Sequence, residues 1–194
     1  EPVNKLLSTP SDGDSVLAVG AVNTSGVVAN FSSYGPSSDG QVKPDVAAVG
    51  VGSVILNTNN SIGTGSGTSF ACPKMAGMGT CLWQGFPEFN NMKIRNALWQ
   101  SGSIAGTPNN RIGYGIPNLK TAFGILLTEF ATSSNTIDGC KVTISWTSKD
   151  VNTMKYEIER KGPADISFSK VGELLPVTGV NLTTHNYTFN NTLA

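Results

Sequence analysis

The sequence contains one histidine and few charged residues. Charged residues make up 13% of it, and the 13 Lys and Arg residues balance the 13 Asp and Glu residues, so the formal net charge is zero. Balanced charge offers no electrostatic footprint for nucleic acid or for an anionic membrane surface. No apolar run approaches the roughly 20 residues of a membrane span. We therefore expect neither a nucleic-acid partner nor a membrane partner.

Cysteine is also scarce, with three residues in the chain. Cys72 and Cys81 fall in one predicted helix, about 13 Å apart along its axis, which is too far for a disulfide bond. Cys140 is the odd one, and no pair has the spacing of metal ligands. We expect all three to be small buried hydrophobic residues, and we expect no metal and no cofactor.

The first part of the chain shows both strand and helix patterns. Residues 15–22 form an almost continuous apolar run, which is typical of a strand buried on both faces, and residues 44–56 hold one or two more short strands. Apolar spacing predicts helices over 69–84, over 90–102 with Asn90 as the cap, and over 116–127. Up to residue 127 the sequence therefore indicates a mixed α/β domain.

The pattern changes to alternation with period two after residue 127. Residues 141–148, 155–162 and 185–191 alternate apolar and polar side chains, and turn-forming residues separate them. This pattern predicts an all-β sandwich module over 128–194 with four strands. Because such a sandwich usually has about seven strands, we expect the module to be incomplete.

Small residues crowd around Ser69 in "GTGSGTSFACPKMAG", residues 63–77. A nucleophilic serine needs an exposed hydroxyl, a base, and donors aimed at the developing oxyanion. The first N–H groups of a helix lack intrahelical partners, and small residues such as Gly67 let a peptide backbone come close. The composition suits a serine at the mouth of a buried helix. On local composition alone, an ordinary helix cap is the commoner explanation.

Longer segments resemble a known family. "GTSFACPKMAGM" resembles the nucleophile motif of subtilisin-like serine proteases, and "SVLAVGAV", "FSSYGP", "KPDVAAVG" and "RIGYGIPNL" are similar to other segments of that family in the same order. The resemblance covers about residues 5–125. It implies that 1–127 is the C-terminal part of a three-layer α/β domain with a parallel sheet. It also implies peptide-bond hydrolysis through an acyl-enzyme on Ser69, whose backbone N–H is an oxyanion donor, with Gly67 and Thr68 as backbone support.

The sequence departs from this family pattern upstream of Ser69. The family order along the chain is Asp, His, Ser, and no histidine precedes Ser69. The turn that carries the family's oxyanion asparagine is missing, and Asn4 does not match it. We therefore expect the catalytic Asp, His and Asn to lie upstream, in an absent N-terminal half of the domain. The expected partners are that half and a polypeptide substrate, and the 194 residues alone should show little or no turnover.

The single histidine, His185, is another candidate for a catalytic site. With Asp138 or Asp150 as the acid, His185 would complete the chain order Ser, Asp, His of an α/β-hydrolase. In that case the chain would be a self-contained hydrolase that uses His185 as its base. The α/β-hydrolase fold requires glycine two residues after the serine, and this chain has Ala71 there. We interpret His185 instead as a solvent-facing strand residue.

Two further residues near the motif have simpler explanations. Asp45, in "KPDV", stands where the family has a structural aspartate, so we expect it to support a turn or strand. Lys74 lies five residues after Ser69. At about 100° per residue it points to another side of the helix and is not expected to act as the base.

The part of the chain after 127 resembles the fibronectin type III-like module that follows catalytic domains in secreted proteins of gliding bacteria. The cues are "VTISWT", "YEIERKG" and "KVGEL", and the resemblance implies that Trp146 is a core tryptophan. We expect an extracellular or cell-surface protein of bacterial origin. Calcium is common in the protease family, but no Asp-rich loop argues for a site here. A non-catalytic structural or binding unit, with the β module as a spacer or adhesion element, is the alternative function.

Overall fold

The protein is described by a computed structural model that covers residues 6–150, 153–162, 164–177 and 184–192. The chain forms two compact units, Glu1–Leu126 and Leu127–Ala194. The sequence placed its boundary after residue 127, one residue later. Among the described residues, no helix has both the length and the apolar character that a membrane-crossing segment requires.

A two-stranded parallel sheet lies in the first unit. Strand β1 (Val19–Val22) pairs with β2 (Val46–Val49), with Val19 opposite Val46. Both strands are largely buried, as their continuous apolar runs predicted. The strand predicted over 15–22 is shorter than expected, because regular pairing begins only at Val19.

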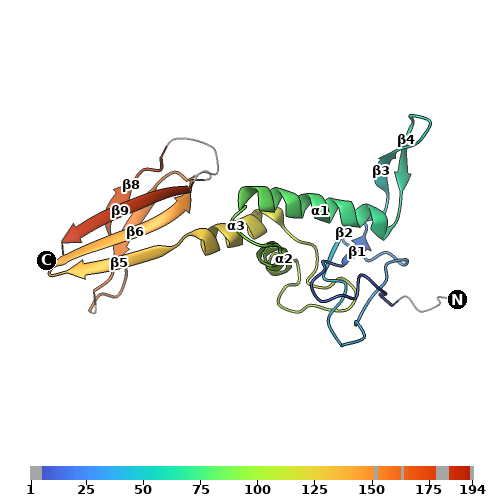
Figure 1. Cartoon of the computed structure of the whole chain (residues 1–194), viewed down its shortest axis with the longest axis horizontal. Helices are drawn as coiled ribbons and strands as arrows, with labels where there is room; N and C mark the ends of the chain where they lie inside the picture. Colours follow the sequence, from blue (N-terminus) through green and yellow to red (C-terminus); the bar gives the residue numbers. More distant parts are fainter. Residues whose placement is uncertain (1–5, 151–152, 163, 178–183, 193–194) are drawn as a thin grey trace. The chain divides into compact units, whose positions relative to one another are not determined.

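A β-hairpin follows the sheet and leads to the first helix. Strands β3 (Ser53–Leu56) and β4 (Ile62–Gly65) are antiparallel, with Leu56 opposite Ile62. The hairpin projects from the rest of the first unit (Figure 1). Three of its apolar side chains are 71–81% exposed: Val54, Leu56 and Ile62.

In the described residues, three helices lie close to the predicted ranges, and the third begins in the first unit and continues past its last residue, Leu126. They are α1 (Thr68–Gly85), α2 (Asn91–Gln100) and α3 (Leu119–Phe130). Asn90 caps α2, since its side chain accepts a hydrogen bond from the Lys93 N–H at 3.0 Å. Helix α1 packs against β1, β2 and α2, and Phe86 at its end meets Phe123 of α3 with ring centroids 4.9 Å apart.

Two expectations about burial are wrong. Only one side of α1 is buried, through Ala71, Met75, Leu82 and Gly85, so it is not the buried helix that its small residues suggested. The three cysteines are exposed rather than buried. Small residues are compatible with either environment, because they have little apolar surface to remove from water.

A glycine turn late in the first unit's sequence contacts the chain just before β2. Gly113 has φ +62°, and a Cβ there would lie 2.1 Å from the Asp45 carbonyl oxygen. The next residue, Tyr114, donates its N–H to that same oxygen at 2.8 Å. The turn therefore needs glycine both for its conformation and for its contact with the chain before β2.

The second unit consists of antiparallel strands in the described residues. Strands β5 (Ser133–Asp138), β6 (Lys141–Lys149) and β9 (Thr184–Thr192) form one sheet in the order β5-β6-β9. Strands β7 (Tyr156–Arg160) and β8 (Ser169–Leu174) form another. Five strands are therefore present where four were predicted. Two of the five, β5 and β8, lie outside the three alternating ranges that predicted strands, and the residues of β5 are all exposed.

An aromatic and acidic cluster links the two sheets of the second unit. Trp146 is half-buried and stacks on Tyr187 with ring centroids 5.4 Å apart. Tyr156 of β7 and Tyr187 of β9 both donate their hydroxyl protons to the Asp150 carboxylate. Burial and the Asp150 carboxylate raise the pKa of Tyr187 to about 12. Trp146 thus packs against side chains of its own unit, as expected for a core residue.

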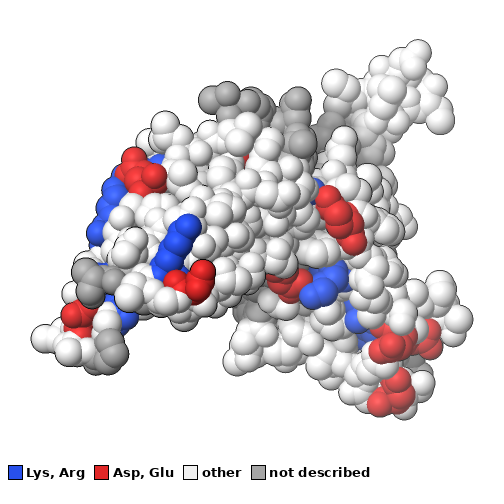
Figure 2. All heavy atoms as spheres, turned by 60° about the vertical axis from the view of Figure 1, so that its left-hand side comes forward, with Lys and Arg blue, Asp and Glu red and all other residues white. Residues whose placement is uncertain are grey.

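On the face shown in Figure 2, acidic and basic side chains lie beside one another in a few small groups, and most of the surface is uncharged. In the second unit, Lys155 and Lys170 each contact Glu157 and Glu173 at 2.6–3.1 Å. These side chains are substantially exposed, so the network adds little stability. The mixture of signs agrees with the zero net charge of the sequence.

Candidate active site

Ser69 lies in the first turn of α1, and its side chain is exposed. The helix begins after Gly67, whose φ of 164° is extended backbone. The Ser69 hydroxyl has no hydrogen-bond partner among the residues that the structure describes. An exposed, unpartnered hydroxyl at a helix start can approach an electrophile without first breaking a contact.

Two backbone donors accompany this hydroxyl. The first amide of the helix to find an acceptor is that of Phe70, which donates to the Gly67 carbonyl at 3.1 Å. In the described part of the chain, the amides of Thr68 and Ser69 have no acceptor. Free N–H groups and the helix dipole at this end both favour a negative charge.

The end of β2 fixes the turn before Ser69. The Gly67 N–H donates to the Gly50 carbonyl at 2.8 Å. A Cβ at Gly50 would lie 2.6 Å from the Gly67 carbonyl oxygen and 2.8 Å from Ala21 Cβ. Only glycine at position 50 lets the sheet come this close to the turn, so Gly50 helps to set the place of Ser69.

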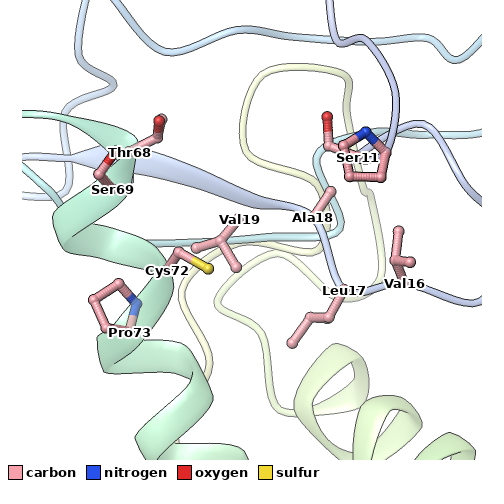
Figure 3. A pocket seen from close by; sticks show the side chains of 10 residues that line it. Ser11, Val16, Leu17, Ala18, Val19, Thr68, Ser69, Cys72 and Pro73 are labelled. Carbon is pink, nitrogen blue, oxygen red and sulfur yellow. The ribbon is translucent and has the colours of Figure 1, made fainter.

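An open pocket of about 670 Å³ lies beside Ser69 (Figure 3). One side is the start of α1, where the Cys72 sulfur points into the space between the helix and β1. The other side is the chain that leads into β1. The ten lining residues are Pro10, Ser11, Val16, Leu17, Ala18, Val19, Thr68, Ser69, Cys72 and Pro73.

The structure does not give Ser69 a base within the first unit. That unit contains no histidine, since the single one is His185. His185 lies half-buried in β9 of the second unit, paired with Ser148 of β6. The Lys74 ammonium bonds to the Val49 carbonyl and to Ser53 Oγ, each at 2.8 Å. Lys74 thus lies toward the end of β2, in keeping with its predicted direction.

Asp45 has the structural role expected for it, and Lys43 shares that role. The Asp45 carboxylate accepts the Ala18 N–H at 2.6 Å and forms an ion pair with Lys43 Nζ at 2.9 Å. Lys43 and Asp45 are 1% and 2% exposed. Burial raises the pKa of the Asp45 carboxyl, and the bonds from Ala18 and Lys43 partly offset this rise. A lysine is almost never buried without a partner. The position of Lys43 two residues before Asp45 was the sequence feature that could have predicted this ion pair.

No group of three or more His, Cys, Asp and Glu side chains with metal-binding geometry occurs in the described ranges. Asp138 and Asp150, the candidate acid partners of His185, both lie in the second unit. Asp150 there accepts the two tyrosine hydroxyls.

Comparison with known proteins identifies the family. The model of the subtilase family (peptidase S8) matches residues 2–115, more than half of the chain. The chain belongs to the subtilase family. The match includes Ser69, the helix start and the pocket, so the site described above is part of the subtilase portion. The family portion ends before α3.

Individual subtilases show the same relation. The chain is 33% identical over 100 residues to a thermostable alkaline protease of Halalkalibacterium halodurans, covering 52% of this chain and 26% of that protein. It is 40% identical over 99 residues to a thermophilic serine proteinase of Bacillus sp. strain AK1, covering 50% and 23%. The chain thus spans about a quarter of the length of these curated relatives.

A solved subtilase structure shares the fold. The self-cleaved protease domain of PatA superposes with a TM-score of 0.53 at 29% identity, covering 63% of this chain and 46% of that domain. The subtilase relationship and the α/β fold therefore agree with what the resemblance implied.

Proposed function

We propose that this polypeptide is part of a secreted serine endopeptidase that cleaves peptide bonds through an acyl-enzyme on Ser69. The observation that carries the proposal is the exposed Ser69 hydroxyl beside two helix-start amides that have no acceptor in the described structure. The serine protease names of the relatives support the same reaction class. Gly67 and Thr68 serve as backbone support, and the Ser69 and Thr68 N–H groups are candidate oxyanion donors.

In this reaction Ser69 Oγ attacks the carbonyl carbon of the scissile peptide bond. Its proton passes to a base and then to the leaving amine as the C–N bond breaks, and water hydrolyses the resulting ester. The proposal takes this base, with its acid partner and an oxyanion asparagine, from polypeptide outside the first unit. This follows from composition, because the first unit has no histidine.

The second unit fits a spacer in this proposal. Its antiparallel sheets and the packed Trp146 support the fibronectin type III-like interpretation. The same features also fit the alternative function, a non-catalytic structural or binding protein. The missing base in the first unit is the observation that favours that alternative.

Labelling with a fluorophosphonate, read by intact mass, tests the proposal. Imidazole is added as a soluble substitute for the base. We expect slow labelling of the chain alone. Imidazole should accelerate it by at least about tenfold, a small part of the 10²–10⁴ that a positioned base contributes. Ser69→Ala should abolish the labelling, whereas Ser25→Ala, which alters an exposed serine outside this pocket, should leave it unchanged.

Two outcomes would contradict the proposal. A chain that stays unlabelled even in imidazole would favour the non-catalytic alternative. Labelling that occurs without imidazole and is lost in His185→Ala would favour the self-contained hydrolase.

A further inference from the structure

One wall of the Ser69 pocket is an irregular segment, residues 13–18, just before β1. Val16, Leu17 and Ala18 of this segment line the pocket. Residues 14–17 make no backbone-to-backbone hydrogen bond within the described part of the chain. Sheet pairing therefore does not fix this part of the wall, and another set of contacts must do so.

Three charged side chains supply those contacts. Lys43 Nζ donates to the carbonyl oxygens of Gly13 at 2.9 Å and Val16 at 3.4 Å. From α2, Arg95 Nη1 donates to the Asp14 carbonyl oxygen at 2.6 Å. Three of the wall's carbonyl groups are thus held by two cations.

The Asp45 carboxylate contacts the other end of the segment, at Ala18. It accepts the Ala18 N–H at 2.6 Å and pairs with Lys43 at 2.9 Å. Because carbonyl dipoles alone do not neutralise a buried ammonium, this pairing lets Lys43 reach the wall from inside the protein.

The residues that carry these three side chains are themselves anchored. The Lys43 backbone carbonyl accepts the Gly35 N–H at 2.7 Å, and that of Asp45 accepts the Tyr114 N–H at 2.8 Å. The Arg95 guanidinium lies 4.2 Å from the centroid of the Trp99 ring. Because these three residues are anchored, their contacts can fix the position of the 13–18 segment.

We propose that Lys43, Asp45 and Arg95 are positioning residues that hold the 13–18 wall across the pocket from Ser69 and Cys72 (Figure 3). They act through the wall and do not touch the reacting atoms. The role rests on the proposed function only in that a peptide substrate of Ser69 would occupy this pocket. The placing of the wall itself can be tested without activity.

A fluorine probe on Cys72 reports the wall directly. In a Cys81→Ser/Cys140→Ser background, Cys72 is alkylated with a trifluoromethyl reagent and followed by ¹⁹F NMR. The matched probe is Cys81, on the same helix but outside the pocket lining, labelled in a Cys72→Ser/Cys140→Ser background. Each background then receives Lys43→Met/Asp45→Asn or Arg95→Met. The double substitution removes both buried charges together and keeps an acceptor for the Ala18 N–H.

We expect the Cys72 resonance to shift or broaden in both variants, with the Cys81 resonance and the urea midpoint close to the parent. Arg111→Met is the control, because Arg111 lies over the Tyr34 ring and has no bond to the wall; it should leave the Cys72 resonance unchanged. In the imidazole-assisted reaction, the probe concentration for half-maximal labelling of Ser69 should rise about tenfold at an unchanged maximal rate. One hydrogen bond to a charged group contributes about 1.5 kcal/mol, and about 1.4 kcal/mol is a factor of ten.

An unchanged Cys72 resonance in both variants would overturn the proposal. So would a joint change of both resonances and of the midpoint, since that would show a role in overall stability alone. If Ser69 is not labelled even in the parent chain, the proposed function fails, whereas the two resonances still decide whether the wall is positioned.

Discussion

The two units of the molecule differ in the side chains that hold their interiors together. The first unit packs apolar side chains of several sizes, and Ala21, Ala47, Phe86 and Leu126 are all 0% exposed. Among its described residues, the second unit has few buried side chains and links its sheets through tyrosine hydroxyls on Asp150. Close packing leaves the first unit little room to adjust, so the buried ion pair of Lys43 and Asp45 has to fit. The second unit depends instead on hydrogen bonds around a half-buried aromatic cluster.

The largest expected effect comes from breaking the ion pair of the first unit. Lys43→Met leaves the Asp45 carboxylate buried without its partner, and we expect the free energy of unfolding to fall by about 3–5 kcal/mol. The measurement is urea unfolding followed by the helical circular dichroism signal, because the three helices begin in the first unit.

The double variant and a surface control sharpen this prediction. Lys43→Met/Asp45→Asn should recover most of the loss, because a neutral pair leaves no uncompensated charge. Lys74→Met, an exposed lysine of α1, should cost about 1 kcal/mol. A loss for Lys43→Met no greater than that for Lys74→Met would remove the contrast between the units.

A smaller effect is expected in the second unit from Asp150→Ala. It leaves the hydroxyls of Tyr156 and Tyr187 without their acceptor, and we expect a loss of about 2–3 kcal/mol. The loss is read from the Trp146 indole signal during urea unfolding. Asp150→Asn keeps one acceptor and should cost less. Equal losses in the two variants would show that the hydroxyl bonds do not hold the sheets together.

The smallest effect is a dependence on alkaline pH. The Tyr187 pKa is raised to about 12 from an ordinary value of 10.0, so the unfolded state releases this proton at lower pH than the folded state. The free energy of unfolding should therefore fall as pH rises through that window, by about 1.4 kcal/mol at pH 11 and by at most about 2.7 kcal/mol above the folded pKa. Urea unfolding of the second unit across this range should show a shallower fall in Tyr187→Phe than in the parent. Identical slopes would contradict the assignment.

Sequence patterns predicted the strongly periodic elements and missed those without periodicity. The apolar stripes of α2 and α3 and the alternation of β6 gave elements close to those observed. Strand β4 has the sequence Ile-Gly-Thr-Gly, and β5 is mostly polar, so neither carries a strand signal. Pairing with β3 and β6 forms these strands, and that is tertiary information.

The candidate site divides in the same way. Ser69 and its helix start were predictable, because a motif of adjacent residues specifies them. The positioning set was not, since Lys43, Asp45 and Arg95 meet the 13–18 wall only after folding brings α2 and the chain before β2 together. Asp45 was expected to support a turn or strand, but neither cation was connected with the pocket.

The hairpin before Ser69 has a consequence for how this region can change. Its base is closed twice, by the Gly67 N–H on the Gly50 carbonyl at 2.8 Å and by the Gly52 N–H on Ser66 Oγ at 3.0 Å. The tip, residues 57–61, is exposed and polar. Because a closed base separates the tip from α1, residues can be inserted or deleted there at a small entropic cost without moving the nucleophile. The tip is therefore the natural place to graft a peptide or fluorescent tag close to the site.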